Sequence, residues 1–273
     1  IIMKNITDEE FRLLADYIKA NFGINLSEQK KTLLVNRLYK LVASLNLNSI
    51  TDYYEYLLNE KSGKAKIELV NNITTNHTFF MREISHFKFF ANEVLPYISK
   101  NIRDYDLRIW TAACSTGEEA YTLAMIIDDF FSEDALRWNK KILATDISEK
   151  ALNCAMKGQY SGNEIAGLPS SWKLNKMKEV EKNIYQIKEE IRSEIIFRKF
   201  NLMTDVFPFK KNFQTIFCRN VMIYFDYETR KNLVKKFYKA LEPGGYLFVG
   251  HAETIERGNS GFKYVMPSVY RKE

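Results

Sequence analysis

The N-terminal part of the chain carries apolar side chains at helical spacing. Thr7 to Glu10 form a capping-box pattern, and the apolar positions that follow recur every three or four residues as far as Gly23, which should end the helix. Ser27 is placed to cap a second helix, whose apolar stripe consists of Leu34, Leu38, Leu41, Val42 and Leu45. Further helical stretches are predicted at residues 51–60, 64–76 and 85–99.

From about Asp106 the pattern changes to short apolar strands that alternate with helices. Helices are predicted at residues 120–131, from Ser148 onward, and at 227–241. The predicted strands are residues 107–112, 141–145, 195–200, 215–218 and 246–250. Such alternation predicts an α/β domain with a doubly wound, mostly parallel sheet that helices cover on both faces.

Three segments of this α/β part need separate predictions. Pro243-Gly244-Gly245 should make the turn before the strand at residues 246–250. Residues 262–270 could add a last strand antiparallel to it. Residues 158–193 fit the alternation poorly, and we predict that they form an inserted helix with a small hairpin.

Composition narrows the class of protein. The 273 residues, 46% of them hydrophobic, can bury a core in one large domain or two unequal ones. No apolar run approaches the roughly 18 residues of a membrane helix, and the N-terminus lacks a signal-peptide layout, so we expect a soluble protein. The cysteines are scattered and the histidines are not clustered, which argues against a disulfide framework or a zinc site and suits a reducing cytoplasm.

The charge balance leaves the partner open. A net charge of +6 and a pI near 9.0 would suit nucleic acid, anionic lipid or an acidic protein surface. A merely solvated basic surface explains the same modest imbalance. Charge alone therefore does not decide the function.

A loop of small residues follows the first predicted strand. It runs from Ala112 to Gly117 and is followed by Glu118 and Glu119 at the start of a helix. Small side chains let a ligand approach the backbone closely, but the loop matches neither a phosphate loop nor the three-glycine dinucleotide fingerprint. Two glutamates would repel a pyrophosphate, whereas they suit a ligand that carries an ammonium and a sulfonium.

An acidic residue, Asp146, ends the next strand. A carboxylate at this position can accept hydrogen bonds from both hydroxyls of a ribose. The small-residue loop, this acid and the later Pro-Gly-Gly turn together indicate S-adenosylmethionine as the ligand. The alternative is that Glu118, Glu119 and Asp146 only favour the positive ends of helices.

Longer motifs occur in a fixed order along the chain. They are TTNHTFFMRE at residues 74–83, WTAACSTGEE at 110–119, Asp146-Ile147, Asn201-Leu202, FCRNVMIYFD at 217–226, and Gly250-His251-Ala252-Glu253. Together they resemble the chemotaxis receptor methyltransferase family, called CheR. The run at residues 217–226 is the longest and most specific, and the motifs span most of the chain.

The resemblance implies a domain plan. Residues 1–76 would form an all-helical, receptor-docking domain, residues 77–100 a linker and connecting helix, and residues 101–273 a class I methyltransferase domain dependent on S-adenosylmethionine. This last domain would have an antiparallel last strand and a small β-subdomain inserted at about residues 160–195.

The resemblance also implies the activity. The protein would transfer a methyl group from S-adenosylmethionine to glutamate side chains of transmembrane chemoreceptors, leaving S-adenosylhomocysteine and using no metal. Its partner would be the cytoplasmic helical region of the receptors. The enzyme would be cytoplasmic and recruited to membrane receptor arrays, without inserting into the membrane or binding nucleic acid.

Site residues follow from the same matching positions. Asn76, Thr78 and Arg82 would close over the cofactor, Glu119 would hold its amino group, and Asp146 would hold its ribose. Asn201 and Leu202 would border the adenine. Arg219 and Asn220 would complete the pocket. Arg82 and Tyr224 would lie nearest the reacting centre.

The chemistry of a glutamate acceptor agrees with this set of residues. A carboxylate with a reference pKa of about 4.3 is already ionised at neutral pH and needs no general base. Arg82 could orient it through its guanidinium fork, although a structural ion pair with Glu83 is the alternative. Tyr224 could line the methyl pocket, or be an ordinary buried tyrosine at a strand end. His77, His86 and His251 are too far apart in sequence to suggest a triad.

A basic face is expected on the helix that begins at Ser27. Lys30, Arg37 and Lys40 fall along one flank of its apolar stripe, and we predict that they dock an acidic receptor helix. A solvated face is the alternative. Some members of the family also bind a receptor peptide through the β-subdomain, but residues 176–183 lack the glycine-rich turn of those members, so this tether stays open.

Two other functions remain possible from the sequence. The same cofactor site could serve a different acceptor such as RNA, but Arg219-Asn220-Val221-Met222 lacks the aromatic-flanked acidic motif that grips a flipped base. A module that binds S-adenosylmethionine or its product without catalysis is the second. The apparently complete set of cofactor and catalytic candidates argues against it.

Overall fold

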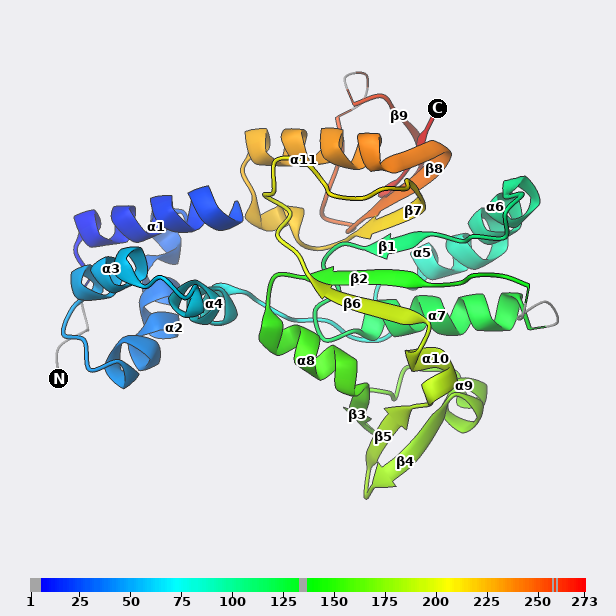
Figure 1. The fold of residues 1–273 in the computed structure, drawn as a ribbon, viewed down its shortest axis with the longest axis horizontal. Helices are drawn as coiled ribbons and strands as arrows, with labels where there is room; N and C mark the ends of the chain where they lie inside the picture. The colour runs from blue at the N-terminus through cyan, green and yellow to red at the C-terminus, as the bar shows by residue number, and fades with distance from the viewer. Residues whose placement is uncertain (1–5, 133–136, 257, 259) are drawn as a thin grey trace.

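The computed structural model describes residues 6–132, 137–256, 258 and 260–273. A helical domain stands beside a larger α/β domain, and a small separate sheet projects from the latter (Figure 1). Among the described residues, no helix combines the length and the apolar character that crossing a membrane requires.

The helical domain is built around one apolar core. Phe11, Leu14 and Ile18 of its first helix pack with the apolar faces of the other helices. The capping box at Thr7 and Glu10 is present, and Gly23 ends the first helix in a left-handed conformation, both as predicted. The helices are α1 (Asp8–Phe22), the 3₁₀ turn η1 (Glu28–Lys30), α2 (Lys31–Ser44), α3 (Ile50–Asn59) and α4 (Lys64–Ile73).

Two details of this domain differ from the prediction. Ser27 precedes the turn η1 and its side chain makes no capping hydrogen bond, so α2 begins only at Lys31. The helix predicted at residues 64–76 ends at Ile73, because the chain becomes extended at Thr74 in order to cross to the other domain.

The next helices belong to the core of the α/β domain. They form an almost continuous rod of α5 (Ile84–Phe89), the π-helical segment η2 (Phe90–Val94) and α6 (Leu95–Asn101). Phe87, Phe90 and Val94 are buried against strand residues such as Phe217 and Phe248. Helical content therefore extends past the helical domain, and the extended residues 74–79 separate the two.

The main sheet has seven strands in the order β6-β2-β1-β7-β8-β10-β9. The first five are parallel and the last two antiparallel, which confirms the doubly wound, mostly parallel sheet with an antiparallel end. The strands are β1 (Ile109–Thr111), β2 (Ile142–Asp146), β6 (Ile195–Lys199), β7 (Phe213–Cys218), β8 (Leu241–Val249), β9 (Phe262–Met266) and β10 (Val269–Lys272).

Alternating side chains bury both faces of this sheet. Ile109 and Phe217 point to the core that holds α5, α6 and α7 (Glu118–Phe130). Their neighbours Trp110 and Ile216 point to the opposite core, under α11 (Tyr227–Ala240). Because both faces are covered, the strands are apolar at nearly every position, as parallel strands usually are.

The helical domain is attached at the carboxyl ends of the parallel strands. Lys19 pairs with Asp226 at 2.7 Å, and the Asn201 side-chain amide donates to the backbone oxygen of Asn21 at 2.7 Å. On the other side of the junction, the Asn71 Oδ1 atom accepts hydrogen bonds from the Ser148 hydroxyl at 2.8 Å and from the backbone N–H of Lys150. Asn71 thus helps Ser148 to cap α8 (Glu149–Lys157).

The insert and the last strands correct three predictions. Residues 158–193 contain a hairpin, as predicted, but a third strand pairs with it and makes a three-stranded antiparallel sheet. The Pro243-Gly244-Gly245 stretch lies inside β8, where the pairing register with β7 shifts, and is not a turn before the strand. The last segment makes two strands, of which β10 pairs with β8. The insert consists of β3 (Gln159–Ser161), α9 (Ser170–Asn175), β4 (Met177–Glu181), β5 (Ile184–Ile187) and α10 (Glu189–Arg192).

Gly23 provides a test of how closely the domains meet. A Cβ atom at Gly23 would collide with the Met203 side chain, whereas one at Gly63 would meet nothing within 4 Å; both glycines have positive φ. We expect both substitutions to lower the free energy of unfolding by about 1–2 kcal/mol through backbone strain. The loss should be the larger for Gly23→Ala, because only there must the flexible end of the Met203 side chain also move. Equal losses in urea denaturation would contradict this account of the junction.

Candidate active site

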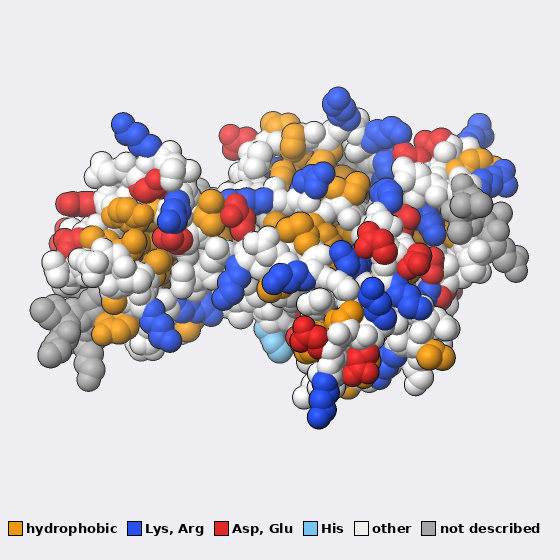
Figure 2. All heavy atoms as spheres, turned by 60° about the horizontal axis from the view of Figure 1, so that its bottom comes forward, with side chains coloured by type: hydrophobic (Ala, Val, Ile, Leu, Met, Phe, Trp, Pro, Cys, Tyr) orange, Lys and Arg blue, Asp and Glu red, His pale blue; other side chains and the backbone are white. Residues whose placement is uncertain are grey.

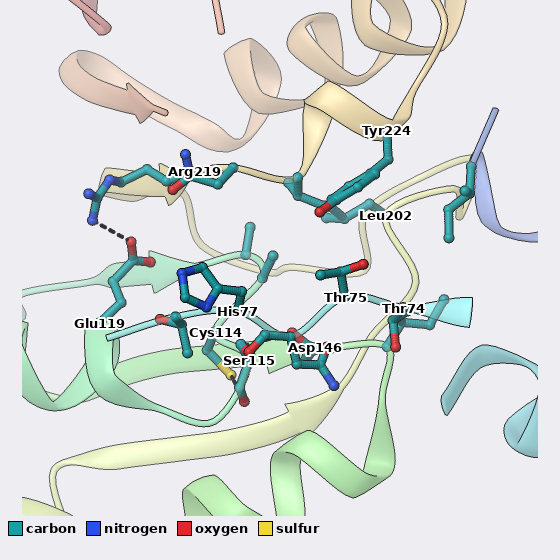
Figure 3. A pocket seen from close by; sticks show the side chains of 18 of the residues that line it. Thr74, Thr75, His77, Cys114, Ser115, Glu119, Asp146, Leu202, Arg219 and Tyr224 are labelled. Atoms are coloured by element: carbon teal, nitrogen blue, oxygen red, sulfur yellow. Dashed lines mark hydrogen bonds and ion pairs between the residues drawn. The ribbon is translucent and has the colours of Figure 1, made fainter. Parts of the chain in front are cut away.

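A pocket opens where the strand ends meet the linker and the helical domain. It encloses about 1130 Å³ of empty space, its open mouth included. Figure 3 shows Glu119 and Arg219 at one end of the pocket and Tyr224 and Thr74 toward the other. The position agrees with the rule that open α/β sheets bind ligands at the carboxyl edge, where the strand order reverses on either side of β1.

The loop after β1 forms the floor of the pocket. Ala112 and Cys114 are buried, and Ser115 takes a left-handed conformation with φ of 49°. This conformation turns the Ser115 N–H toward Asp146, whose Oδ2 accepts it at 2.8 Å. Gly117 has φ of 101° and no room for a side chain, because a Cβ atom would lie 2.9 Å from that of Ala155. The small residues thus serve close packing as well as access to the backbone.

Asp146 is a buried carboxylate at the end of β2. Its other oxygen accepts the N–H of Ser148 at 2.9 Å, so backbone donors fix both oxygens. Burial raises the pKa of Asp146, although the N–H groups of Ser148 and Ser115 oppose the change. The carboxylate is therefore held rigidly at the pocket wall, with lone pairs left for further donors.

Glu119 forms a buried ion pair with Arg219. The Arg219 Nη1 atom lies 2.8 Å from Glu119 Oε2, and the other carboxylate oxygen accepts the Thr111 hydroxyl at 2.5 Å. Its neighbour Glu118 is different: it accepts from the Thr116 hydroxyl and does not line the pocket. Burial raises the pKa of Glu118. Of the two glutamates at the start of α7, only Glu119 faces the ligand space.

Glu83 joins three segments behind the pocket. Its carboxylate accepts hydrogen bonds from the Arg219 guanidinium at 3.1 Å, the Asn220 side-chain amide at 3.1 Å and the His251 N–H at 3.1 Å. Burial opposes its ionisation, but the bonds from Asn220, Arg219 and His251 outweigh it and hold the pKa of Glu83 below its usual value. Among the described ion pairs, Glu83 is matched with Arg219, not with Arg82 beside it in the chain.

A second buried acid, Glu253, holds the loop after β7. It accepts the N–H groups of Gly250 at 2.6 Å, Asn220 at 2.9 Å and Ile223 at 3.1 Å. Burial raises the pKa of Glu253, while these N–H groups oppose that change. Asn220 itself has φ of 58°, a left-handed conformation that asparagine adopts more readily than most residues other than glycine.

The extended linker covers one side of the pocket. The Asn76 carbonyl accepts the Ser115 hydroxyl at 3.2 Å, which ties the linker to the floor loop. Arg82 donates to the His77 carbonyl at 2.8 Å and lies over the Phe79 ring. In the described part of the chain, no carboxylate lies within ion-pair distance of the Arg82 guanidinium, so it can receive one from a ligand.

The remaining wall comes from the β6 and β7 ends. Asn201 and Leu202 follow β6, and the Asn201 amide is already bonded to the helical domain through Asn21. The Tyr224 ring extends into the pocket above Leu202 (Figure 3). The Tyr224 carbonyl accepts the N–H of Asn25 at 2.7 Å, so the helical domain also fixes this tyrosine.

All the cofactor and catalytic candidates from the sequence line this one pocket. They are Asn76, Thr78, Arg82, Glu119, Asp146, Asn201, Leu202, Arg219, Asn220 and Tyr224. A ring of apolar and small polar groups with one acid at the end of β2 and another at the start of α7 can bind a nucleoside that carries a cationic tail.

Comparison with known proteins decides the family. A model described as "CheR methyltransferase, all-alpha domain" matches residues 9–74, and one described as "CheR methyltransferase, SAM binding domain" matches residues 76–270. The chain belongs to the CheR methyltransferase family. This confirms the resemblance found in the sequence, the class I methyltransferase fold and S-adenosylmethionine as the cofactor.

Relatives match this CheR-family chain over nearly their whole length. A chemotaxis protein methyltransferase of Borreliella burgdorferi is 43% identical over 98% of the chain and 95% of the relative. A chemotaxis protein methyltransferase of Escherichia coli is 32% identical over 97% and 91%, and chemotaxis protein methyltransferase 2 of Vibrio cholerae is 34% identical over 94% and 89%. The chain is accordingly a methyltransferase of the chemotaxis type.

The predicted docking residues lie outside the CheR pocket. Lys40 is exposed on α2, and the Lys30 Nζ atom stands 5.9 Å from the centre of the Tyr224 ring, at the edge of the pocket. Arg37 instead bonds to the Ile73 carbonyl and to the Thr75 hydroxyl, and so holds the start of the linker. Over the face drawn in Figure 2, basic side chains are mixed with acidic ones and form no single large patch.

Sequence reasoning missed the contribution of the helical domain to the pocket. Phe22, Ile24, Val70 and Ile73 line it from the ends of α1 and α4. Their apolar spacing is that of ordinary core residues, so no signal in the sequence distinguishes them. Glu83 and Glu253 were also assigned no site role, although both lie within the motifs that carry the family resemblance.

The histidines are less scattered than the sequence suggested. His86 and His251 face each other with ring centres 4.7 Å apart, and potential ligand atoms of Glu83, His86 and His251 lie within 4.8 Å of one another. Glu83 is, however, engaged by the Arg219 guanidinium, and a cation there would have to displace it. The fold brings these residues together from segments that are far apart in the sequence.

His86 should make the stability of this CheR-family protein sensitive to acid. Burial, helped by the nearby Arg219 charge, lowers the pKa of His86 from 6.5 to about 4. The folded state therefore favours the neutral ring. The protein keeps its full stability above pH 6.5 with respect to this group, and it loses stability as the pH falls from 6.5 toward 4, because the unfolded chain binds the proton first. A shift of this size corresponds to about 3 kcal/mol.

The test compares wild type with His86→Phe, which cannot bind the proton. Between pH 7 and pH 4, the free energy of unfolding of the wild type should fall by about 3 kcal/mol more than that of the variant. Other acidic groups contribute to both curves and cancel in the difference. Parallel curves would show that His86 is not kept neutral by the fold.

Proposed function

We propose that this protein transfers the methyl group of S-adenosylmethionine to glutamate side chains of chemoreceptors, giving glutamate methyl esters and S-adenosylhomocysteine. The observation that carries the proposal is the pocket itself. It combines acids suited to the donor, Glu119 and Asp146, with an arginine that has no carboxylate partner among the described residues, Arg82. The chemotaxis-type relatives support a receptor as the acceptor.

The residues of the pocket fit the donor. Asp146 would accept the ribose hydroxyls, and Glu119 the ammonium of the methionine part. Asn201 and Leu202 would border the adenine, with Asn76 and Thr78 closing over it from the linker. Arg219 and Asn220 would complete the end of the pocket near Glu119. Glu83 and Glu119 both pair with Arg219, so these buried groups carry one more negative charge than positive, which a cationic ligand can balance.

The reaction needs positioning more than acid–base catalysis. When bound, S-adenosylmethionine supplies a methyl group on a sulfonium, which a carboxylate oxygen can attack directly. An O–C bond forms as the C–S bond breaks, its electron pair stays on sulfur, and no proton moves. Arg82 would align the acceptor carboxylate with the methyl group, and Tyr224 would shape the space beside it.

Docking of the receptor would use the exposed side of α2. Lys30 offers positive charge at the pocket edge and Lys40 offers it on the exposed side of α2, while Arg37 would act indirectly, through the linker that it holds. An acidic helix from the cytoplasmic part of a receptor would suit this face. Such docking would bring the enzyme, as a cytoplasmic protein, to membrane receptor arrays without membrane insertion or nucleic acid.

Methyl transfer to receptors is the direct test. The protein is incubated with S-adenosylmethionine labelled in the methyl group and with membranes that contain chemoreceptors. Base-labile label on receptor glutamates would support the proposal. Label on RNA, or binding of the cofactor without transfer to any acceptor, would overturn it.

Arg82 should matter for transfer more than for folding. Arg82→Ala removes the charged fork and should lower kcat/KM for the receptor by about 10- to 100-fold, the usual range for one charge-assisted contact. Arg82→Lys keeps the charge without the fork, so its kcat/KM should lie between that of the wild type and that of Arg82→Ala. Steady-state kinetics at saturating cofactor measures both variants. Wild-type values in the two variants would exclude the role.

The basic face on α2 should set the salt dependence of the reaction. The double variant Lys30→Glu with Lys40→Glu should have a higher KM for the receptor than the wild type. KM of the wild type should increase with ionic strength, whereas KM of the variant should increase less or decrease, since attraction becomes repulsion. The control is Lys235→Glu with Lys239→Glu, the same charge change on the exposed side of α11. If both double variants behave alike, the effect is one of net charge and α2 is not the docking face.

A further inference from the structure

We infer that Glu83 is a positioning residue that holds Arg219 away from full pairing with Glu119, so that Glu119 stays available for the ammonium of the cofactor. The inference rests on the placement of the ammonium at Glu119 under the proposed function. Glu83 does not itself line the pocket and would act on the ammonium site through Arg219.

The two oxygens of Glu83 have separate tasks. Oε2 faces Arg219, with Nη2 at 3.1 Å and Nε at 3.4 Å. Oε1 accepts from the Asn220 amide and from the His251 N–H, both at 3.1 Å. One oxygen therefore holds the arginine, while the other holds the two loops that border it.

Arg219 is shared between two carboxylates. Its side chain is 2% exposed, and it gives only Nη1 to Glu119, because Nη2 is directed to Glu83 and to the Arg82 carbonyl. The Phe87 ring lies 5.1 Å from the guanidinium carbon and limits its movement. A buried guanidinium that lost Glu83 would gain most by turning a second N–H toward Glu119, since bidentate pairs are the stronger arrangement.

Such a turn would affect one part of the ligand only. Glu119 would then be the sole carboxylate partner of Arg219, and its oxygens would be taken up by the guanidinium and by the Thr111 hydroxyl. A ligand ammonium would find a weaker acceptor there. The nucleoside part would still meet Asp146 and the floor loop, which Glu83 does not contact. The backbone of Glu83 has φ of 56°, an uncommon conformation for a non-glycine residue, so the fold holds this carboxylate behind Arg219 at a cost in strain.

Glu83→Gln tests the inference with two ligands. Gln can keep an oxygen toward Asn220 and His251 while it replaces the oxygen that faces Arg219 with an amide NH2. We expect Kd for S-adenosylhomocysteine to rise about tenfold and Kd for 5′-methylthioadenosine, which lacks the amino-acid part, to change less than twofold. Calorimetry on protein with a wild-type thermal unfolding profile measures both. KM for S-adenosylmethionine should rise with the first, and KM for the receptor should not.

Two further variants make the result specific. Glu118→Gln removes the buried carboxylate that directly precedes Glu119 in α7 and does not line the pocket. This variant should keep the wild-type ratio of the two affinities. Glu83→Asp keeps the charge, so its ratio of the two Kd values should lie between those of the wild type and Glu83→Gln. If Glu83→Gln does not fold, Glu83→Asp is compared with the wild type in its place. An unchanged ratio in both Glu83 variants would overturn the inference. Failure of the wild type to bind S-adenosylhomocysteine would instead overturn the placement of the cofactor.

Discussion

The active site depends on one buried guanidinium. Arg219 has to be paired because an uncompensated charge with this little exposure would cost several kcal/mol. Its partners Glu119 and Glu83 come from the start of α7 and from the linker, and Arg219 itself follows β7. The need to satisfy this one charge therefore brings three distant segments to a common point, and the pocket forms beside it.

The pocket is completed by the helical domain. Asn21 and Asn25, next to the end of α1, bond to Asn201 and to Tyr224, so the residues proposed to border the adenine and the methyl group are set by contacts across the junction. Part of the pocket wall is apolar surface from α1 and α4. Neither domain alone contains the whole site, which accounts for the short linker and the many polar contacts between the two.

The sequence was most informative where one physical requirement dominates. The parallel strands are buried on both faces, so they stand out as apolar runs, and the capping box at Thr7 is a local pattern with a local cause. Residues 177–181 were harder, because β4 exposes nearly every side chain and has no apolar alternation to reveal it. In β8, Pro243 to Gly245 suggested a turn, whereas the strand accommodates them through a shift in register.

The site was predictable only as a set of positions. Family motifs brought Arg82, Asp146 and Tyr224 to one pocket, but motifs do not specify partners. The chain places Glu83 beside Arg82, yet its carboxylate reaches Arg219, and Arg37 was expected to face a receptor but holds the linker. Partners of this kind depend on three-dimensional geometry that spacing along the chain does not encode.

The contact of Asn71 with Ser148 has a mechanical consequence. Asn71 belongs to α4 of the helical domain, but its side-chain oxygen reaches the first turn of α8, two residues beyond Asp146. If the domains swung apart, this contact would break in the turn that orients the Asp146 carboxylate. A separation of the domains would thus disturb, through one amide, the geometry of Asp146, the acid proposed to bind the ribose. An enzyme with its domains apart would then have a less ordered nucleoside site.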